Sequence, residues 1–89
     1  MSERDRVFTV VGRRWCHLCD DMVERLQPIA DEFGCEIEVL DVDEDEALEE
    51  RWGLLVPVLL AGDDELCHHR LDVAAVRAYC RGFPLKSVP

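Results

Sequence analysis

The chain has 89 residues and a mass of 10.2 kDa, which suffices for one domain and leaves no room for a second hydrophobic core. Its 20 acidic and 10 basic residues give a net charge of −10, which repels nucleic-acid phosphates and anionic lipid headgroups. The first six residues mix charges of both signs, unlike a secretory signal, and no segment approaches the roughly 20 apolar residues of a membrane-spanning helix. We therefore expect one cytoplasmic domain over residues 1–89, with its core at about 6–83, and no nucleic-acid or membrane partner.

The chain has five cysteines, an odd number, whereas a secreted disulfide framework normally uses an even one. In a reducing compartment, thiols are catalytic, metal-bound or simply buried. Cys35 and Cys80 are predicted to be small core residues. The pattern leaves the role of Cys67 open.

The first half of the chain predicts two strands around a helix. A β-rich apolar run over residues 7–11 predicts a central strand that is covered on both faces. Helically spaced apolar residues over 18–33 predict a helix that ends at Gly34 and is kinked by Pro28. Alternating acidic and apolar residues over 36–42 predict the second strand.

A short helix and a buried strand are expected next. Asp43 and Glu46 have the spacing of a capping box, which predicts a helix that ends at Gly53. Residues 54–60 are the most apolar stretch, and Pro57 within them excludes a helix and favours an extended chain.

The chain closes with a second arm of a hairpin over residues 65–70 and a last helix that starts at the N-cap Asp72. Gly82 and Pro84 end this helix. Its apolar face is predicted to hold Val73, Val76, Tyr79, Cys80 and Phe83. The resulting order, β-α-β-α-β-β-α, is an α/β fold with a four-stranded mixed sheet and helices on both faces.

The residues with the clearest chemistry form the motif Cys16-His-Leu-Cys19, which follows the first strand and opens the first helix. At a helix N-terminus, free N–H groups and the helix dipole stabilise a thiolate. One helical turn separates the two cysteines, so they are close enough to form a disulfide. The positive charges of Arg13 and Arg14 favour the thiolate of Cys16 further, and the acidic residues after Cys19 oppose it.

Two other interpretations of this motif compete with a redox site. The cysteines can be plain buried residues, since cysteine is often buried. They can also hold zinc together with Cys67 and either His68 or His69. The zinc site is disfavoured because Cys67, His68 and His69 are consecutive residues of a predicted strand. Neighbouring side chains of a strand point to opposite faces of the sheet.

A cysteine pair with two residues between, followed downstream by Val56-Pro57 before an apolar strand, resembles the thioredoxin-fold superfamily and, within it, the short glutaredoxin-like proteins. The resemblance covers nearly the whole chain. It implies a cis peptide bond before Pro57, with the proline lying against Cys16. It also implies that the Val56 backbone pairs with an extended substrate segment.

The chain departs from the family at several positions. Glutaredoxins carry a Gly-Gly pair and acidic residues before the last helix, where they bind glutathione; residues 68–72 stand there instead, and of these Asp72 alone corresponds. Arg13 or Arg14 is expected to replace the basic residue upstream of the cysteines. Trp15 resembles its counterpart in thioredoxins. The strand carboxylate of thioredoxins is replaced by Val10.

The resemblance implies a thiol–disulfide oxidoreductase in which Cys16 attacks a protein or small disulfide and Cys19 resolves the mixed disulfide. It implies no bound cofactor and no metal. Glutathione, as a co-substrate, or a protein reductase would supply the electrons. A non-enzymatic module of the same fold, which binds a partner protein or zinc through these cysteines, is the alternative.

Overall fold

The computed structural model describes residues 6–62 and 64–82 of the chain. Its elements are, in order, β1 (Val7–Gly12), α1 (His17–Phe33), β2 (Glu36–Asp41), the 3₁₀ helix η2 (Val42–Glu44), α2 (Glu46–Trp52), β3 (Val58–Ala61), β4 (Asp64–His68) and α3 (Val73–Arg81). Apart from η2, this is the predicted order of strands and helices.

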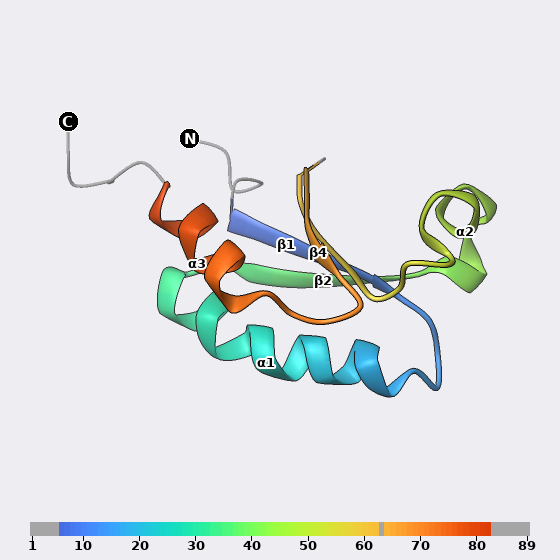
Figure 1. Cartoon of the computed structure of the whole chain (residues 1–89), viewed down its shortest axis with the longest axis horizontal. Helices are drawn as coiled ribbons and strands as arrows, with labels where there is room; N and C mark the ends of the chain where they lie inside the picture. The colour runs from blue at the N-terminus through green and yellow to red at the C-terminus, as the bar shows by residue number, and fades with distance from the viewer. Residues whose placement is uncertain (1–5, 63, 83–89) are drawn as a thin grey trace.

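The four strands form one mixed sheet in the order β2-β1-β3-β4 (Figure 1). β1 runs parallel to β2 and antiparallel to β3, and β4 returns antiparallel to β3. The central position of β1 explains its nearly continuous apolar sequence, since Phe8, Val10 and Val11 are all buried.

The two faces of the sheet hold separate hydrophobic clusters. α1 lies along one face with α3 beside its C-terminal part, and α2 lies at the other end of the sheet (Figure 1). The larger cluster, between the sheet and α1 and α3, contains Phe8, Val10, Met22, Leu26, Ile29, Ala30, Cys35, Leu59, Ala61, Val76 and Cys80. The smaller one contains Val11, Val42, Trp52 and Val58, with Leu48 of α2 packed against it. Helices therefore cover both faces, and each fully buried large apolar side chain contributes about 1.5–3 kcal/mol.

The ends of α1 follow from its sequence. Cys16 is its N-cap, with an extended backbone. Gly34 ends it in the left-handed conformation at φ 69°, where its N–H donates to the carbonyls of Ala30 and Asp31. The helix continues through Pro28, which lacks one backbone N–H.

The predicted capping box at the second helix is wrong. The N-cap of α2 is Asp45, whose carboxylate accepts from the backbone N–H groups of Ala47 and Leu48. Asp41 instead caps η2 by accepting from the Asp43 N–H at 2.8 Å. The acidic run therefore forms two short capped turns, because each aspartate competes for the nearest free N–H groups.

The last two elements are close to their predicted limits. β4 starts one residue earlier than expected and ends at His68 rather than Arg70. Asp72 is the N-cap of α3, as predicted, and Gly82 follows its last residue. Val76 and Cys80 are buried, but Val73 is 43% exposed and so lies outside the core. Phe83 and Pro84 lie outside the described residues.

Candidate functional site

The two cysteines of the motif are joined by a disulfide at the N-terminus of α1. Their Cα atoms are 5.2 Å apart, within the usual range for a disulfide. Cys16 is half-buried, whereas Cys19 is buried at 6% exposure. The predicted closeness of the two cysteines is confirmed, and Cys16 is the more accessible of the two.

The capping position determines the surroundings of the Cys16 sulfur. The backbone N–H of Cys19 donates to Cys16 Sγ at 3.2 Å, and the N–H of Asp20 donates to the Cys16 carbonyl at 3.1 Å. The Cys19 N–H belongs to the first turn of α1, whose N–H groups have no carbonyl partner within the helix. A thiolate on Cys16 would therefore face this N–H donor and the positive end of the helix dipole.

Cys19 packs closely against the end of β1. A Cβ atom at Gly12 would lie 3.0 Å from Cys19 Sγ and 3.2 Å from Cys19 Cβ, so glycine is needed for this approach. A pocket of about 170 Å³ reaches Cys19 from the side of the edge strand β2. Its lining residues are Val10, Gly12, Arg13, Arg14, Cys19, Asp20, Val23, Val39, Leu40 and Asp41.

The two residues just before Cys16, Arg14 and Trp15, are exposed to solvent. Trp15 is 95% exposed and has a positive φ of 59°, which is uncommon for a residue with a side chain. Arg14 is exposed beside it and makes no ion pair with any residue in 6–62 or 64–82. A broad open depression separates these two side chains from the acidic residues Asp41, Asp43 and Glu44.

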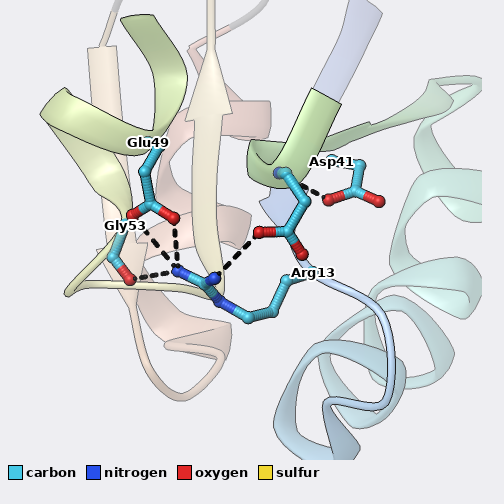
Figure 2. A network of polar contacts seen from close by, with 5 residues as sticks. Arg13, Asp41, Glu49 and Gly53 are labelled. Atoms are coloured by element: carbon cyan, nitrogen blue, oxygen red, sulfur yellow. Dashed lines mark hydrogen bonds and ion pairs between the residues drawn. The ribbon is translucent and has the colours of Figure 1, made fainter. Parts of the chain in front are cut away.

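Arg13 has a different environment from Arg14, because its guanidinium contacts α2 and the preceding turn (Figure 2). It donates to Asp43 Oδ1 at 3.1 Å, to the Glu49 carboxylate at 3.2 Å and to the Gly53 carbonyl at 2.8 Å. These contacts tie the loop after β1 to η2, to the middle of α2 and to the C-cap of α2. Arg14 is consequently the better candidate of the two for contact with an anionic ligand.

The segment before β3 contains the only cis peptide bond in the described residues, between Val56 and Pro57. Pro57 is fully buried, and Val56 is half-buried with no backbone hydrogen bond to any described residue. The implied pairing of the Val56 backbone with an extended substrate segment stays a prediction. The expected contact of Pro57 with Cys16 stays a prediction.

Sequence reasoning missed the role of His69 beside this segment. Its backbone N–H donates to the Pro57 carbonyl at 2.7 Å, and its ring Nε2 lies 3.4 Å from the Leu54 carbonyl. Its φ of 67° places it in the left-handed region, where histidine is less rare than most residues. No sequence pattern marks such a residue, since the contact joins segments 12 or more positions apart.

Asp72 and Cys67 lie together at the start of α3. Asp72 Oδ1 accepts from the Ala75 N–H at 3.0 Å, and the Asp72 N–H donates to Cys67 Sγ at 3.5 Å. Burial raises the pKa of the Cys67 thiol, and the negative charges of Asp72 and Glu65 add to this, while the Asp72 N–H opposes it. Within residues 6–62 and 64–82, no group of three or more His, Cys, Asp or Glu side chains is arranged to hold a metal. The zinc interpretation therefore gains no support from the described part of the chain.

Comparison with known protein families identifies the family to which the chain belongs. Residues 8–80 match the family Glutaredoxin-like domain (DUF836). The chain belongs to this glutaredoxin-like family. The match includes both cysteines and Val56-Pro57. No curated protein matches the sequence.

Solved structures agree with this family and with the thioredoxin fold. Protein Ne2328 from Nitrosomonas europaea is 39% identical, with a TM-score of 0.77 over 84% of this chain and 91% of its own. The structural genomics target XcR50 from X. campestris is 35% identical, with a TM-score of 0.68 over 86% and 99%. Thioredoxin 1 from Thermosipho africanus shares the fold at 22% identity, with a TM-score of 0.59 over 84% and 90%. None of the helices in the described residues is long and apolar enough to cross a membrane.

Proposed function

We propose that the protein is a thiol–disulfide oxidoreductase that uses Cys16 as nucleophile and Cys19 as resolving cysteine. The observation that carries this proposal is the unequal pair at the N-terminus of α1, where Cys16 is accessible and Cys19 is buried. The glutaredoxin-like family and the thioredoxin fold support a thiol redox role at the general level.

In the reducing direction, the Cys16 thiolate attacks one sulfur of a substrate disulfide and releases the other as a thiolate. The Cys19 N–H, which donates to Cys16 Sγ, and the positive end of the α1 dipole stabilise the attacking charge. Cys19 then attacks Cys16 Sγ, which releases the reduced substrate and leaves the Cys16–Cys19 disulfide. The short Cα–Cα distance makes this step intramolecular and therefore fast.

The bond returns to the dithiol when a reductant attacks its accessible sulfur, that of Cys16. The cleavage leaves a mixed disulfide between the reductant and Cys16, with Cys19 as the departing thiolate. A second thiol of the reductant then releases Cys16. Three of the five cysteines are free thiols, which suits a reducing compartment such as the cytoplasm.

Substrate contact is assigned to Trp15, an exposed ring next to Cys16, and to the unpaired backbone of Val56, which the family resemblance implies to lie near Cys16. An extended protein segment suits these two residues, because the backbone gives affinity and the tryptophan gives contact area. Glutathione is expected to bind weakly, in the millimolar range, equivalent to no more than about −4 kcal/mol. The side chain of His69 beside Leu54 and the net charge of −10 both disfavour an anionic tripeptide.

A disulfide-reduction assay tests the proposal. The wild-type protein should reduce insulin or a small aromatic disulfide when a dithiol regenerates it, and Cys16→Ser should lower the rate at least about 100-fold. Cys67→Ser is the matched control, since it also removes one half-buried thiol, and should keep the wild-type rate. Equal activity of the wild type and Cys16→Ser, or zinc bound in stoichiometric amount to the active preparation, would contradict it.

A further inference from the structure

The two edges of the sheet are built differently. β2 is one edge strand and β4 is the other. The ladder of β4 is interrupted by a register shift between Leu59 and Leu60 of its neighbour, and such bulges protect an edge from further strand pairing. β2 instead keeps an unbroken register with β1 from Glu36 to Asp41, and it contains no lysine and no proline. The β2 edge therefore lacks the bulge, lysine or proline that commonly blocks the addition of another strand.

The outer backbone of β2 has no partner in the described part of the chain. Every ladder partner of β2 lies on β1, and no other backbone hydrogen bond within residues 6–62 and 64–82 reaches positions 36–41. An edge strand directs about half of its N–H and C=O groups away from its one neighbour. These groups are donors and acceptors for an added strand.

One face of β2 adds an apolar pocket to this edge. Val39 pairs with Val10 and therefore lies on the face of the sheet that α1 covers, yet it is 60% exposed. Val39 and Val23 of α1 both line the pocket of about 170 Å³ that reaches Cys19. A side chain on this face of an added strand would lie next to Val39, where it can enter the pocket and remove apolar surface from water.

The opposite face of β2 is acidic. Glu36 and Glu38 alternate with apolar residues, so both carboxylates lie on the face away from α1. Both are exposed, and Glu38 accepts the Thr9 hydroxyl at 3.2 Å. Two copies of β2 laid edge to edge would bring these carboxylates together, because β2 contains no basic residue. The net charge of −10 also disfavours a second copy, so a basic strand is the complementary one.

We propose that the β2 edge is a docking site for an extended protein segment in which basic and apolar residues alternate. The segment pairs with the outer backbone of β2, places its basic side chains beside Glu36 and Glu38, and places an apolar side chain against Val39 and into the pocket. The backbone hydrogen bonds supply affinity, and the two different faces of β2 select the sequence. No thiol reaction is part of this binding, so it is independent of the proposed oxidoreductase activity.

A peptide titration of the full chain, isotopically labelled and with Cys16–Cys19 oxidised, tests the proposal. The probe is the capped peptide Lys-Val-Lys-Val-Lys-Val-Lys. We expect it to shift the amide NMR signals of residues 36–41 and of Val23, with a dissociation constant below about 1 mM at low salt. Salt at about 0.5 M should weaken the binding, because exposed charges are then screened.

Two control peptides separate charge from pattern. A peptide with glutamate in place of every lysine should bind at least about 10-fold more weakly, because its charge repels that of β2. A peptide of the original composition, with all lysines before all valines, keeps the charge. It should also bind more weakly, because it cannot present one basic and one apolar face to β2.

Two variants with the same change of charge locate the site. Val39→Lys puts a positive charge at the edge and should weaken binding of the lysine peptide at least about 10-fold. Leu54→Lys is the matched control, because Leu54 is an apolar residue outside β2 that is 95% exposed. It should leave the affinity within about twofold, since charges far apart on the surface are screened. Glu38→Gln, which keeps the shape of the side chain, should weaken binding severalfold.

Several results would overturn the proposal. One is equal binding of the lysine and glutamate peptides, and another is equal weakening by Val39→Lys and Leu54→Lys, which would leave only the net charge. Shifts at Trp15 and Val56 without shifts at positions 36–41, or no shift at all at millimolar peptide, would also contradict it. Signals of residues 36–41 that move with protein concentration in the absence of peptide would show that a second copy of the chain covers the edge instead.

Discussion

The two ends of α1 carry cysteines in opposite electrostatic surroundings. At the N-terminal end, the sulfur of Cys16 accepts a hydrogen bond from a backbone N–H. At the C-terminal end, the thiol of Cys35 donates to the carbonyl of Phe33. A helix has unpaired N–H groups at its start and unpaired carbonyls at its end, so the same residue type is favoured as a thiolate at one end and as a thiol at the other.

Burial adds to this difference. Cys16 is half-buried next to the exposed Trp15, whereas Cys35 and Cys80 lie in the core. Water stabilises a thiolate at the first site and is excluded from the second. The helix end and the depth of burial, rather than the residue type, therefore distinguish the accessible Cys16 from the buried Cys35 and Cys80.

The largest expected effect concerns the N-terminal pair and tests the proposed roles of Cys16 and Cys19. Cys19→Ser removes the resolving thiol, so a mixed disulfide on Cys16 should accumulate to nearly one equivalent when the variant meets a protein disulfide. Mass spectrometry of the non-reduced tryptic digest should find the adduct on peptide 15–25, which contains Cys16. An adduct on Cys67 instead, or none, would show that Cys16 is not the nucleophile.

A second prediction concerns alkaline stability at the C-terminal end. Burial raises the pKa of the Cys80 thiol from 9.0 to about 11, with Cys35 adding to the rise. Below pH 9 the thiol is neutral in both the folded and the unfolded protein, so stability is unaffected. Between pH 9 and 11 the unfolded chain releases the proton and the folded one does not, so up to about 2–3 kcal/mol of stability is lost.

Urea unfolding at pH 8, 9, 10 and 11 measures this loss. Cys80→Ala has no thiol to ionise at this position, so its stability should fall less steeply than that of the wild type above pH 9. Parallel curves for the two proteins would mean that Cys80 titrates normally.

A third prediction concerns the close packing of Cys19 on β1. Gly12→Ala places a methyl group 3.0 Å from Cys19 Sγ, so the sulfur has to move, at an expected cost of about 1–3 kcal/mol. Gly82→Ala, at the end of α3, is the control: its Cβ would meet the Tyr79 carbonyl oxygen at 3.3 Å, a looser contact than at Gly12, and the loss of stability should be smaller. Thermal unfolding of the oxidised forms compares them, and equal losses would contradict the assigned role of Gly12.

The smallest expected effect is that of the Arg13 contacts (Figure 2). Arg13→Gln removes two exposed ion pairs and a hydrogen bond to Gly53, and should cost no more than about 1 kcal/mol. Arg14→Gln should leave stability unchanged, since Arg14 is exposed and has no ion pair to the described residues. Chemical unfolding at low and high salt measures both, and a salt-independent loss at Arg13 would point away from ion pairs.

Local signals in the sequence were sufficient for most of the fold. Apolar periodicity predicted β1 and α1, and Gly34 and Asp72 marked helix limits, because each acts on its own neighbours. The capping box at Asp43 failed because several aspartates compete within one acidic run, and spacing alone does not say which one reaches the free N–H groups.

Contacts between segments far apart in the chain could not be predicted from the sequence. The motif predicted the Cys16–Cys19 pair, because residues three positions apart at the start of a helix lie about one turn from each other. The burial of Cys35 and Cys80 in one hydrophobic cluster depends instead on the packing of α3 against α1 and the sheet. The contact between His69 and Leu54 likewise depends on how the hairpin returns past the loop before β3.

Competitive alkylation of the reduced protein tests the difference between the two ends most directly. A limiting amount of iodoacetamide at pH 7, followed by unfolding, labelling of the remaining thiols with a heavy reagent and trypsin digestion, ranks the five cysteines in one experiment. We expect Cys16 to react first, Cys67 more slowly, and the buried Cys19, Cys35 and Cys80 last. Labelling of Cys35 or Cys80 as fast as Cys16 would contradict this expectation.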